Sequence, residues 1–342
     1  MVFLFKTLHK FIFDYFEILD FLCLPKSLNY CQSGSLNLTV KRSTFIKTSI
    51  LGSISSISLN EIKLKPSPKI SLSAWSIMRT GYGKPDPGGI DLFDYPMIAK
   101  ELGFNYIEHE MFHFPNNLND KIIFKMVKRC EEAEINSVLL LTGGIGDITD
   151  TNKKYRKIAL KKYIKWMDIA HLLKCKSMRN VCADRITISR AEKLKYAIEG
   201  VSELTDYAKK LDMDLLIENH NGYSSDPDWL VSLIKKIGSK NLGILGDFTN
   251  WKLTDTPKTF YHDPYQGFQI MSPFIRFVSA KSEKFTSSGD EINTDYTKMF
   301  EILKKSPQLE CIGVEFFGNK IDGKKSVSQT KKLINKSLST IF

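Results

Sequence analysis

Three carboxylates lie at the ends of apolar segments, where an acidic side chain is costly to bury. Glu218 ends the run LLIE, Asp247 ends LGILGD, and Glu315 follows the run IGV. An unpaired charge inside a protein is very unfavourable, so each carboxylate needs a partner. Each could form its own structural salt bridge. Three of them on strands of one sheet would instead repel one another, and a hard divalent ion would relieve that repulsion and supply a Lewis acid.

Other polar residues accompany these carboxylates. His220 lies two residues after Glu218, so both side chains can face the same side of a strand. His220 could ligate a metal ion or hydrogen-bond a substrate. Lys281 could hold a substrate oxyanion or form an ion pair with Glu315. Arg179 could contact substrate oxygens or anchor a metal-binding carboxylate.

Two further candidates for substrate binding come from the beginning of the same region. Trp75 could stack on the face of a sugar ring or be a core residue. Glu108 and Glu110 end one apolar run together, and we expect one of them to pair with a lysine. His109 and His113 are interpreted as surface or loop histidines rather than metal ligands.

These residues are spread over eight short apolar runs that alternate with amphipathic helical stretches. Eight strand–helix pairs across about 270 residues predict an α/β fold, a single (β/α)8 TIM barrel, with its chemistry at the carboxyl ends of the strands. A doubly wound sheet is the alternative, but no GxGxxG motif follows the first run. The expected strands are 70–77, 105–111, 137–143, 177–183, 214–220, 242–248, 275–281 and 311–317.

One of the expected helices has a clear beginning. Asp226 is predicted to cap the helix at 226–237, and Pro227 would occupy its first position. In the segment 155–173, apolar residues recur at helical spacing and the residues between them are largely basic. That pattern predicts a helix with one buried face and one solvated face.

The residues before the barrel resemble an export leader. The segment 41–68 opens with a Lys-Arg pair, continues with an uncharged stretch at 48–59, and offers Ser56 and Ser58 as small residues for cleavage. It is similar to a twin-arginine signal followed by a linker, so we expect export, to the periplasm; a cytoplasmic protein is the alternative. The stretch is shorter than the roughly 20 residues that cross a bilayer.

Residues 1–40 precede this leader, although a signal should begin the chain. We interpret 1–40 as an over-extended reading frame and expect translation to begin near Val40. An amphipathic cytosolic extension is the alternative. The barrel domain is expected to occupy 69–342.

The composition is that of a globular protein. The 342 residues are 42% apolar and 25% charged, which argues against a disordered, collagen-like or coiled-coil chain. The formal net charge of +11 is not concentrated in a basic run, so no nucleic-acid partner is expected. The six cysteines include no CxxC pair, which argues against a zinc ribbon or a thioredoxin-type site.

Seven motifs, in their order and spacing over 70–342, resemble the xylose isomerase-like barrels, specifically the sugar phosphate isomerase/epimerase family. The motifs are SLSAWSI, IGDITD, KWMDIAHLLKCKSMR, LLIENHNGYSSDPDWL, GDFTNW, VSAKS and IGVEFFG. The resemblance implies a carbohydrate substrate and a divalent metal ion; no stable membrane insertion is expected, and a homo-oligomer is possible.

The resemblance also implies roles for individual residues. Glu218, Asp247 and Glu315 fall on metal-ligand positions of the family, and the two glutamates also fall on its acid/base pair. The family supplies a further ligand from a His-Ala-Lys stretch, which here reads Ser279-Ala280-Lys281, so the fourth ligand is open and His220 is a candidate. Oxygen ligands favour Mg or Mn over Zn or Co.

The expected reaction is a metal-assisted proton shift through an enediolate, as in a sugar isomerase or epimerase. Two alternatives share the fold: a lyase that acts on keto-glycosides by β-elimination, and an inactive, exported sugar-binding barrel. A multi-zinc endonuclease of the apurinic type is disfavoured, because such a cluster needs several histidines at strand ends.

Overall fold

The computed structural model describes residues 67–78, 90–183, 186–253, 262–318 and 323–341. The predicted extension 1–40 lies outside the described residues, and so does the predicted signal and linker at 41–68 apart from its last two residues. The expectations of export and of a later translation start therefore stay predictions.

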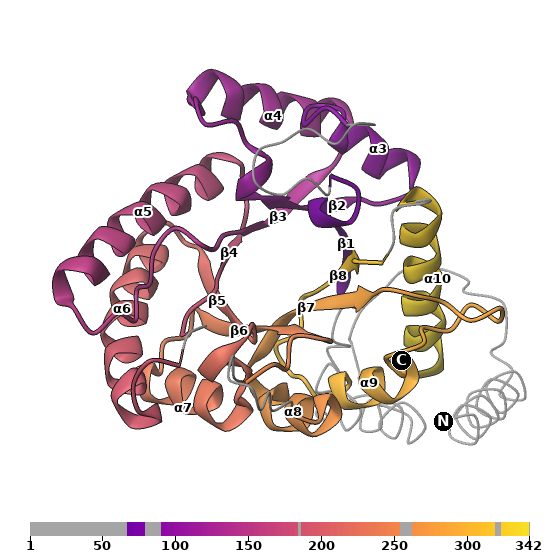
Figure 1. The fold of residues 1–342 in the computed structure, drawn as a ribbon. Coiled ribbons are helices and arrows are strands. Elements are labelled where there is room, and N and C mark those ends of the chain that lie inside the picture. Colours follow the sequence, from indigo (N-terminus) through magenta and orange to yellow (C-terminus); the bar gives the residue numbers. More distant parts are fainter. Residues whose placement is uncertain (1–66, 79–89, 184–185, 254–261, 319–322, 342) are drawn as a thin grey trace, which may run out of the picture. The chain divides into compact units, whose positions relative to one another are not determined.

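Eight parallel strands close into a barrel in chain order, and β8 pairs with β1 (Figure 1). The predicted (β/α)8 barrel is confirmed. The strands are β1 (Lys69–Ser73), β2 (Tyr106–Glu110), β3 (Asn136–Leu141), β4 (Ser177–Asn180), β5 (Asp214–Glu218), β6 (Leu242–Asp247), β7 (Ile275–Ser282) and β8 (Cys311–Phe316).

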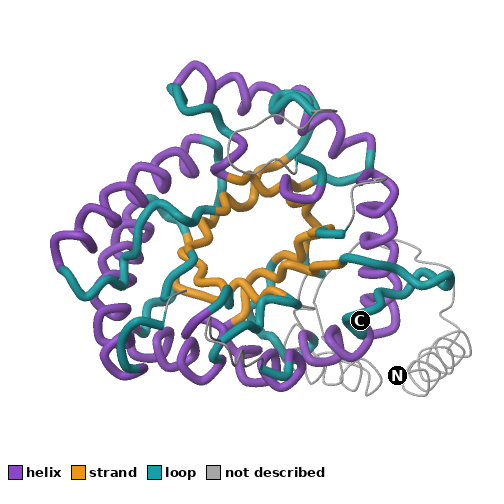
Figure 2. The backbone as a smooth tube through the Cα atoms, in the orientation of Figure 1, coloured by secondary structure: helices purple, strands orange, loops and turns teal. Residues whose placement is uncertain are grey.

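Helices surround the ring of strands (Figure 2). In the described part of the chain, none of them is both long and apolar enough to cross a membrane. The α-helices are α3 (Tyr95–Glu101), α4 (Asp120–Glu132), α5 (Lys153–Leu172), α6 (Arg190–Lys210), α7 (Pro227–Ile237), α8 (Pro264–Met271), α9 (Tyr296–Leu303) and α10 (Gly323–Ile341). The short 3-10 helices are η1 (Ala74–Ser76), η2 (Met111–His113), η3 (Gly222–Ser225) and η4 (Ser272–Phe274).

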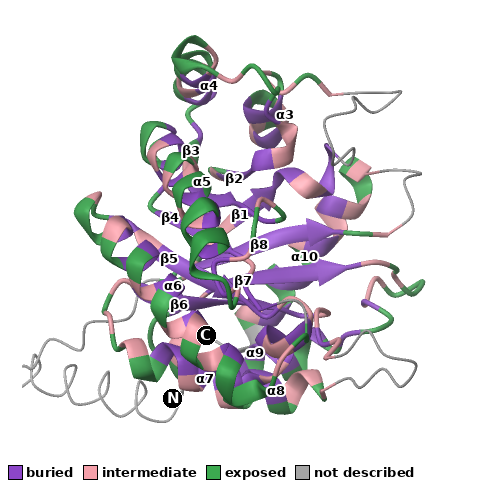
Figure 3. Cartoon of the chain, turned by 60° about the vertical axis from the view of Figure 1, so that its left-hand side comes forward, coloured by how far each residue is buried: buried purple, intermediate pink, exposed green. Residues whose placement is uncertain are grey.

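The main core lies between the strands and the helices, and Figure 3 shows the strands almost wholly buried. Trp229, Tyr163 and Phe104 are among its largest fully buried side chains. This layer fixes the helices against the outside of the barrel and leaves the inner faces of the strands for the site.

The beginning of α7 agrees with its prediction. The side chain of Asp226 accepts a hydrogen bond from the backbone N–H of Trp229 at 3.0 Å, and Pro227 occupies the first turn. Gly238 ends the helix in the left-handed conformation, where a glycine costs least. Such caps fix where the helix begins and ends, and hence where the next strand enters the barrel.

Two strands end at least three residues earlier than predicted. The first was expected to continue to residue 77, but the chain turns into η1 after Ser73, because the N–H groups of Ile77 and Met78 bond to the carbonyl of Ala74. The fourth ends at Asn180 rather than 183, and Ala183 has a positive φ of 55° that an extended strand does not allow. Trp75 therefore lies on a turn rather than on a strand.

Candidate functional site

The inner face of the barrel is apolar at one level and charged at the next. Leu216 and Glu218 share a face of β5, as Leu245 and Asp247 share a face of β6, because side chains two apart point the same way. The charged level lies toward the carboxyl ends of the strands. The apolar level is a buried cluster separate from the main core, formed by Val138, Leu139, Leu141, Leu216, Leu245, Phe277 and Cys311.

The ammonium of Lys281 lies between two of the predicted metal ligands. Its Nζ is 2.9 Å from Asp247 Oδ2 and 3.2 Å from Glu315 Oε1. Strand register explains the meeting, because Lys281 is paired with Glu315 across β7 and β8. Burial alone would lower the pKa of Lys281, but Asp247 and Glu315 outweigh burial and raise it. The alternative interpretation of Lys281 as an ion-pair partner of Glu315 therefore describes its geometry.

The other oxygens of these two carboxylates also have donors. Asp247 Oδ1 accepts the backbone N–H groups of Thr249 and Asn250 at 2.7 and 3.0 Å. Glu315 Oε2 accepts a hydrogen bond from the hydroxyl of Ser279. The local turn after β6 and the strand next to β8 thus hold both carboxylates in place.

Arg179 holds the third predicted ligand. Its Nε is 2.9 Å from Glu218 Oε2, and Asn250 Nδ2 donates to Glu218 Oε1 at 2.9 Å. Arg179 Nη1 donates to the carbonyl of Thr142 at 2.7 Å, and Nη2 is 3.7 Å from Glu110 Oε2. Burial would lower the pKa of Arg179, but Glu218 and Glu110 raise it. Arg179 thus holds the carboxylate of Glu218, and its predicted contact with a substrate stays a prediction.

Among the described residues, neither Glu108 nor Glu110 pairs with a lysine, and Glu110 lies near Arg179 instead, so that expectation is wrong. Ser71 Oγ donates to Glu108 Oε1 at 2.5 Å, and burial raises the pKa of Glu108 to about 8. Burial also raises the pKa of Glu110 to about 7, although Arg179 opposes the shift. Both side chains point into the barrel. Burial thus keeps Glu108 largely protonated at neutral pH and brings the pKa of Glu110 close to neutral pH.

The proton on Glu108 predicts a pH dependence of stability. Folded Glu108 releases its proton near pH 8 and an unfolded glutamate near 4.5, so the folded chain binds more protons between these values. Stability therefore falls as pH rises through this window, by up to about 1.4 kcal/mol per pH unit from this group. Glu108→Gln should remove this contribution, which urea unfolding at pH 7 to 8 would measure.

The choice of window separates Glu108 from the two neighbouring histidines, and the variant separates it from Glu110, whose pKa lies at about 7. Burial lowers the pKa of His109 and His113 to about 4, so these histidines affect stability mainly below about pH 6.5. Glu301→Gln, on an exposed side chain of α9, is the matched control and should keep the wild-type slope. The same slope in Glu108→Gln and in the wild type would contradict the assignment.

Glu108 also depends on a glycine in β8. A Cβ added to Gly313 would lie 2.2 Å from Glu108 Oε1, so the carboxyl group occupies the space of the missing side chain. Gly313→Ala should displace Glu108, break its bond to Ser71 and cost about 1–3 kcal/mol of unfolding free energy. Chemical denaturation would measure the loss.

A second substitution tests that explanation of Gly313→Ala. Glu108→Ala frees the space, so the double variant should lose less than the sum of the two single losses. Gly323→Ala is the control, since its added Cβ meets nothing closer than 3.6 Å. Additive losses would show that the methyl group clashes with something other than Glu108.

The three predicted ligands do not converge on one ion position in this structure. Each of the six oxygens of Glu218, Asp247 and Glu315 faces a donor or a cation of the protein itself. In the described ranges, no three His, Cys, Asp or Glu side chains are grouped so that they could hold a metal ion. Ser279, where the resemblance implies a histidine, binds Glu315 instead. The donor set described here therefore does not fit a divalent ion.

The predicted substrate-binding residues His220 and Trp75 are half-buried. The His220 Nδ1 atom lies 3.4 Å from Asn221 Nδ2, and the backbone N–H of His220 donates to Ser224 Oγ at 3.1 Å. The Trp75 ring lies 5.8 Å from His113 and 6.4 Å from Phe317.

Phe317 joins the aromatic and ionic groups of the site. Its side chain is 49% exposed, and Lys281 Nζ lies 5.2 Å from the centre of its ring. The ring of Trp75 also contacts the Phe317 ring, at 6.4 Å between centroids. The two aromatic rings therefore form a surface next to the buried ion pairs.

His109 is a core residue rather than a surface histidine, so that interpretation is wrong. It lies in β2 with its side chain opposite to Glu108 and Glu110, which turns it toward the helices. Its Nε2 is 2.8 Å from Ser137 Oγ, and its ring contacts Tyr95. Burial lowers its pKa to about 4, so it is neutral at physiological pH.

Asn250 and Ser71 were not among the predicted site residues. Asn250 donates to Glu218, and Lys281 Nζ lies 3.5 Å from its Oδ1, so it links the two ion-pair groups. Its position three residues after Asp247 in GDFTNW was the available signal. Ser71 offered none, because a serine in an apolar run does not reveal its partner.

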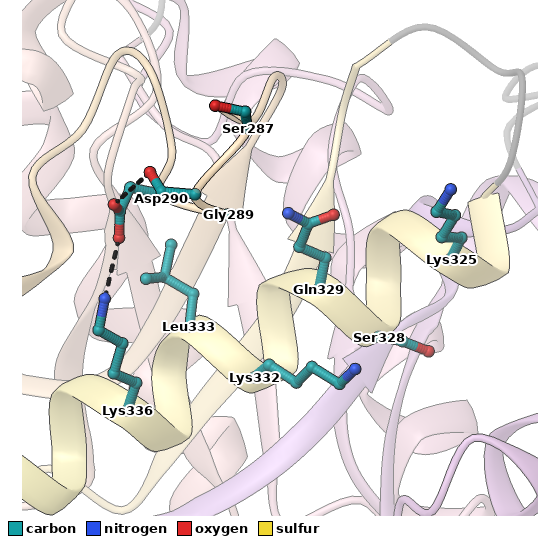
Figure 4. Close-up of a pocket in the computed structure, with 10 residues that line it drawn as sticks. Ser287, Gly289, Asp290, Lys325, Ser328, Gln329, Lys332, Leu333 and Lys336 are labelled. Atoms are coloured by element: carbon teal, nitrogen blue, oxygen red, sulfur yellow. Dashed lines mark hydrogen bonds and ion pairs between the residues drawn. The ribbon is translucent and has the colours of Figure 1, made fainter.

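A depression of about 440 Å³ lies outside the ring of strands (Figure 4). Its lining comes from the loop after β7 and from α10, and Lys336 there pairs with Asp290 at 3.2 Å. The lining contains serines and lysines on the outer surface and none of the interior carboxylates. The charged level of the barrel therefore remains the candidate site.

Comparison with known proteins agrees with the fold. The family described as "Xylose isomerase-like TIM barrel" matches residues 97–338. No curated protein sequence matches the chain.

Solved structures with the same fold are distant in sequence. The IOLI protein with a bound zinc atom has a TM-score of 0.61 and 15% identity, with 80% of this chain and 99% of that one covered. L-ribulose 3-epimerase has a TM-score of 0.63 and 13% identity, with 80% and 95% covered. The 3-keto-D-glucoside 4-epimerase of E. coli has a TM-score of 0.58 and 13% identity, with 79% and 99% covered.

Proposed function

The chain belongs to the xylose isomerase-like TIM barrel family, and on that premise we propose that it is a sugar isomerase or epimerase. It would move a proton on the carbon next to the carbonyl group of a carbohydrate. Two similar structures are sugar epimerases by name, which is consistent with this reaction type.

One observation carries the proposal. At one buried level of the barrel, some carboxylates form ion pairs with cations, and neighbouring carboxyl groups keep a proton near neutral pH. Glu218 faces Arg179 at 2.9 Å, whereas burial raises the pKa of Glu110 to about 7. Proton transfer requires groups that are poised near the working pH and fixed in position. A merely structural ion pair would not require the neighbouring carboxyls.

We assign the proton transfer to Glu218 and Glu315, on β5 and β8. One carboxylate removes the proton next to the carbonyl, and the electron pair of that C–H bond forms an enediolate. The negative charge on the enediolate oxygen is stabilised by Lys281 and Arg179. The other glutamate, in its acid form, returns a proton to the opposite face of the same carbon in an epimerase. In an isomerase the proton returns to the adjacent carbon, and the hydroxyl proton moves from one enediolate oxygen to the other, so that the carbonyl group changes place.

A zinc ion is bound in one similar structure. The donor set of this chain does not fit such an ion in the described arrangement, so the proposed steps use only its own side chains. Asp247 then acts on the position of Lys281, from which it is 2.9 Å away.

We propose an uncharged sugar rather than a sugar phosphate as the substrate. The charged level holds five carboxyl groups and two cations in the described part of the chain. Both cations are already paired with carboxylates, so neither is left to neutralise an added phosphate. The exposed ring of Phe317 and the half-buried ring of Trp75 offer apolar faces that suit the C–H face of a sugar.

Proton exchange in D2O tests the proposal. The purified chain is incubated with a panel of neutral keto sugars, and NMR follows deuterium at the carbon next to the carbonyl. Exchange with an isomer or epimer as product supports the proposal. Exchange with loss of a leaving group would indicate the β-eliminating lyase, and sugar binding without any exchange would indicate an inactive sugar-binding barrel.

A further inference from the structure

We propose that the ammonium of Lys281 is the fixed cation of this site and takes the place of a divalent metal. The inference deepens the proposed function, since it names what would stabilise the enediolate. It depends on the geometry of Lys281, Asp247, Glu315 and Ser279, and its test does not require a substrate.

Lys281 satisfies the two carboxylates that would otherwise repel each other. Its Nζ lies 2.9 Å from Asp247 and 3.2 Å from Glu315, in a region where Asp247 has no exposed surface. A positive charge at this point offsets the repulsion between the two carboxylates, as a metal ion between them would. A divalent ion at the same point would have to displace the ammonium.

Protein groups already contact the oxygens of these three carboxylates: Glu218 Oε2 and Asp247 Oδ2 lack a hydrogen-bond donor, but each lies 2.9 Å from a cation of the protein. The hydroxyl of Ser279 donates to Glu315, so this side chain uses its proton to hold a carboxylate rather than a lone pair to bind a metal. Asp247 Oδ1 receives two backbone N–H groups, and both oxygens of Glu218 face Asn250 or Arg179. Ser279 and Lys281 thus act together. Ser279 stands where the resemblance implies a histidine ligand, and Lys281 supplies the positive charge.

The ammonium can exchange one of its contacts within the protein for a contact with a substrate. An ammonium group has three N–H bonds, and this one forms ion pairs with Asp247 and Glu315. The third contact, to Asn250 Oδ1, is the longest at 3.5 Å. A carbonyl oxygen that replaced Asn250 would be polarised by Lys281 directly.

Metal titration of the wild-type chain is the first test. The full chain is dialysed against EDTA and titrated with MnCl2, ZnCl2 and MgCl2 by calorimetry, and its metal content and melting temperature are measured before and after. We expect no saturable site and an unchanged melting temperature. One ion bound per chain in the untreated protein, with a lower melting temperature after EDTA, would overturn the proposal.

Variants at the two positions are the second test. Lys281→Met combined with Ser279→His removes the charge and adds a ligand, so Mn²⁺ should bind at least about tenfold more tightly than to the wild type. Lys284→Met, on an exposed lysine just beyond β7, is the matched control and should stay unchanged. Lys281→Arg keeps the charge and should also stay unable to bind Mn²⁺.

These outcomes are independent of catalysis. The wild-type and Lys281→Arg titrations decide the proposal even where the double variant fails to fold. Unchanged Mn²⁺ affinity in a folded double variant would overturn it. In a further outcome, the wild-type chain binds no metal and also exchanges no proton in any keto sugar of the panel. That result would support Lys281 as the cation of the site and would refute the proposed function.

Discussion

Glu315→Gln is expected to lower the rate of proton exchange into a keto sugar by about 10²–10⁴-fold, the range typical for loss of a positioned acid or base. The amide keeps the shape of the side chain and can still face Lys281 and Ser279, but it can no longer carry the proton. Glu218→Gln should have an effect of the same size. Steady-state exchange rates in D2O, with circular dichroism to confirm the fold, would measure both.

Two further variants make this prediction specific. Glu301→Gln is a matched control on the outside of α9 and should leave the rate unchanged. Asp247→Asn should reduce the rate less, because Asp247 positions Lys281 and carries no proton, and added Mn²⁺ should not restore it. Wild-type rates in both Glu218→Gln and Glu315→Gln would move the search for the proton carriers to Glu108 and Glu110.

Arg179→Met should cause the largest loss of stability, about 3–5 kcal/mol of unfolding free energy, because removing one partner of a buried ion pair leaves the other uncompensated. The variant leaves Glu218 without its cation and removes the charge that opposes the pKa shift of Glu110. These carboxyls can relieve the cost by taking up protons, so the loss should grow from pH 5 to pH 8. Urea unfolding at both pH values would measure it.

The controls for Arg179→Met separate a buried ion pair from a surface one. Arg190 pairs with Asp226 at 2.7 Å but is half-exposed, so Arg190→Met should cost only about 0–1 kcal/mol. Arg179→Met combined with Glu218→Gln should recover part of the loss, because the orphaned charge is gone. A loss that is the same at pH 5 and pH 8 and is not recovered would point to packing rather than charge.

Much of the fold could be predicted because local patterns and global architecture agree. An apolar run such as LLIE ending at Glu218 is what a barrel strand requires, and Asp226 and Pro227 mark a helix start without reference to the rest of the chain. The first strand was predicted too long because Ala74 to Ser76 is apolar enough to continue it. Only the neighbouring strands, whose pairing with β1 reaches no further than Ser73, decide where it ends.

The residues of the site could be predicted from the sequence, but the pairs that they form with one another could not. Glu218, Asp247, Glu315, Arg179 and Lys281 all point into the barrel, as alternation along a strand requires. Which cation meets which acid depends on register between strands and on side-chain direction, as in the pairing of Lys281 with Glu315. The proton on Glu108 depends on its burial over Gly313, which no local pattern reveals.

The apolar cluster beneath the charged level has a kinetic consequence. Leu216, Leu245 and Phe277 fill the barrel there, so, as far as the described residues go, a reactant reaches Lys281 from the carboxyl ends of the strands and leaves by the same end. Product must leave before the next sugar enters, and each can occupy the route that the other needs. Turnover therefore depends on product release as well as on chemistry, and accumulated product should compete with substrate.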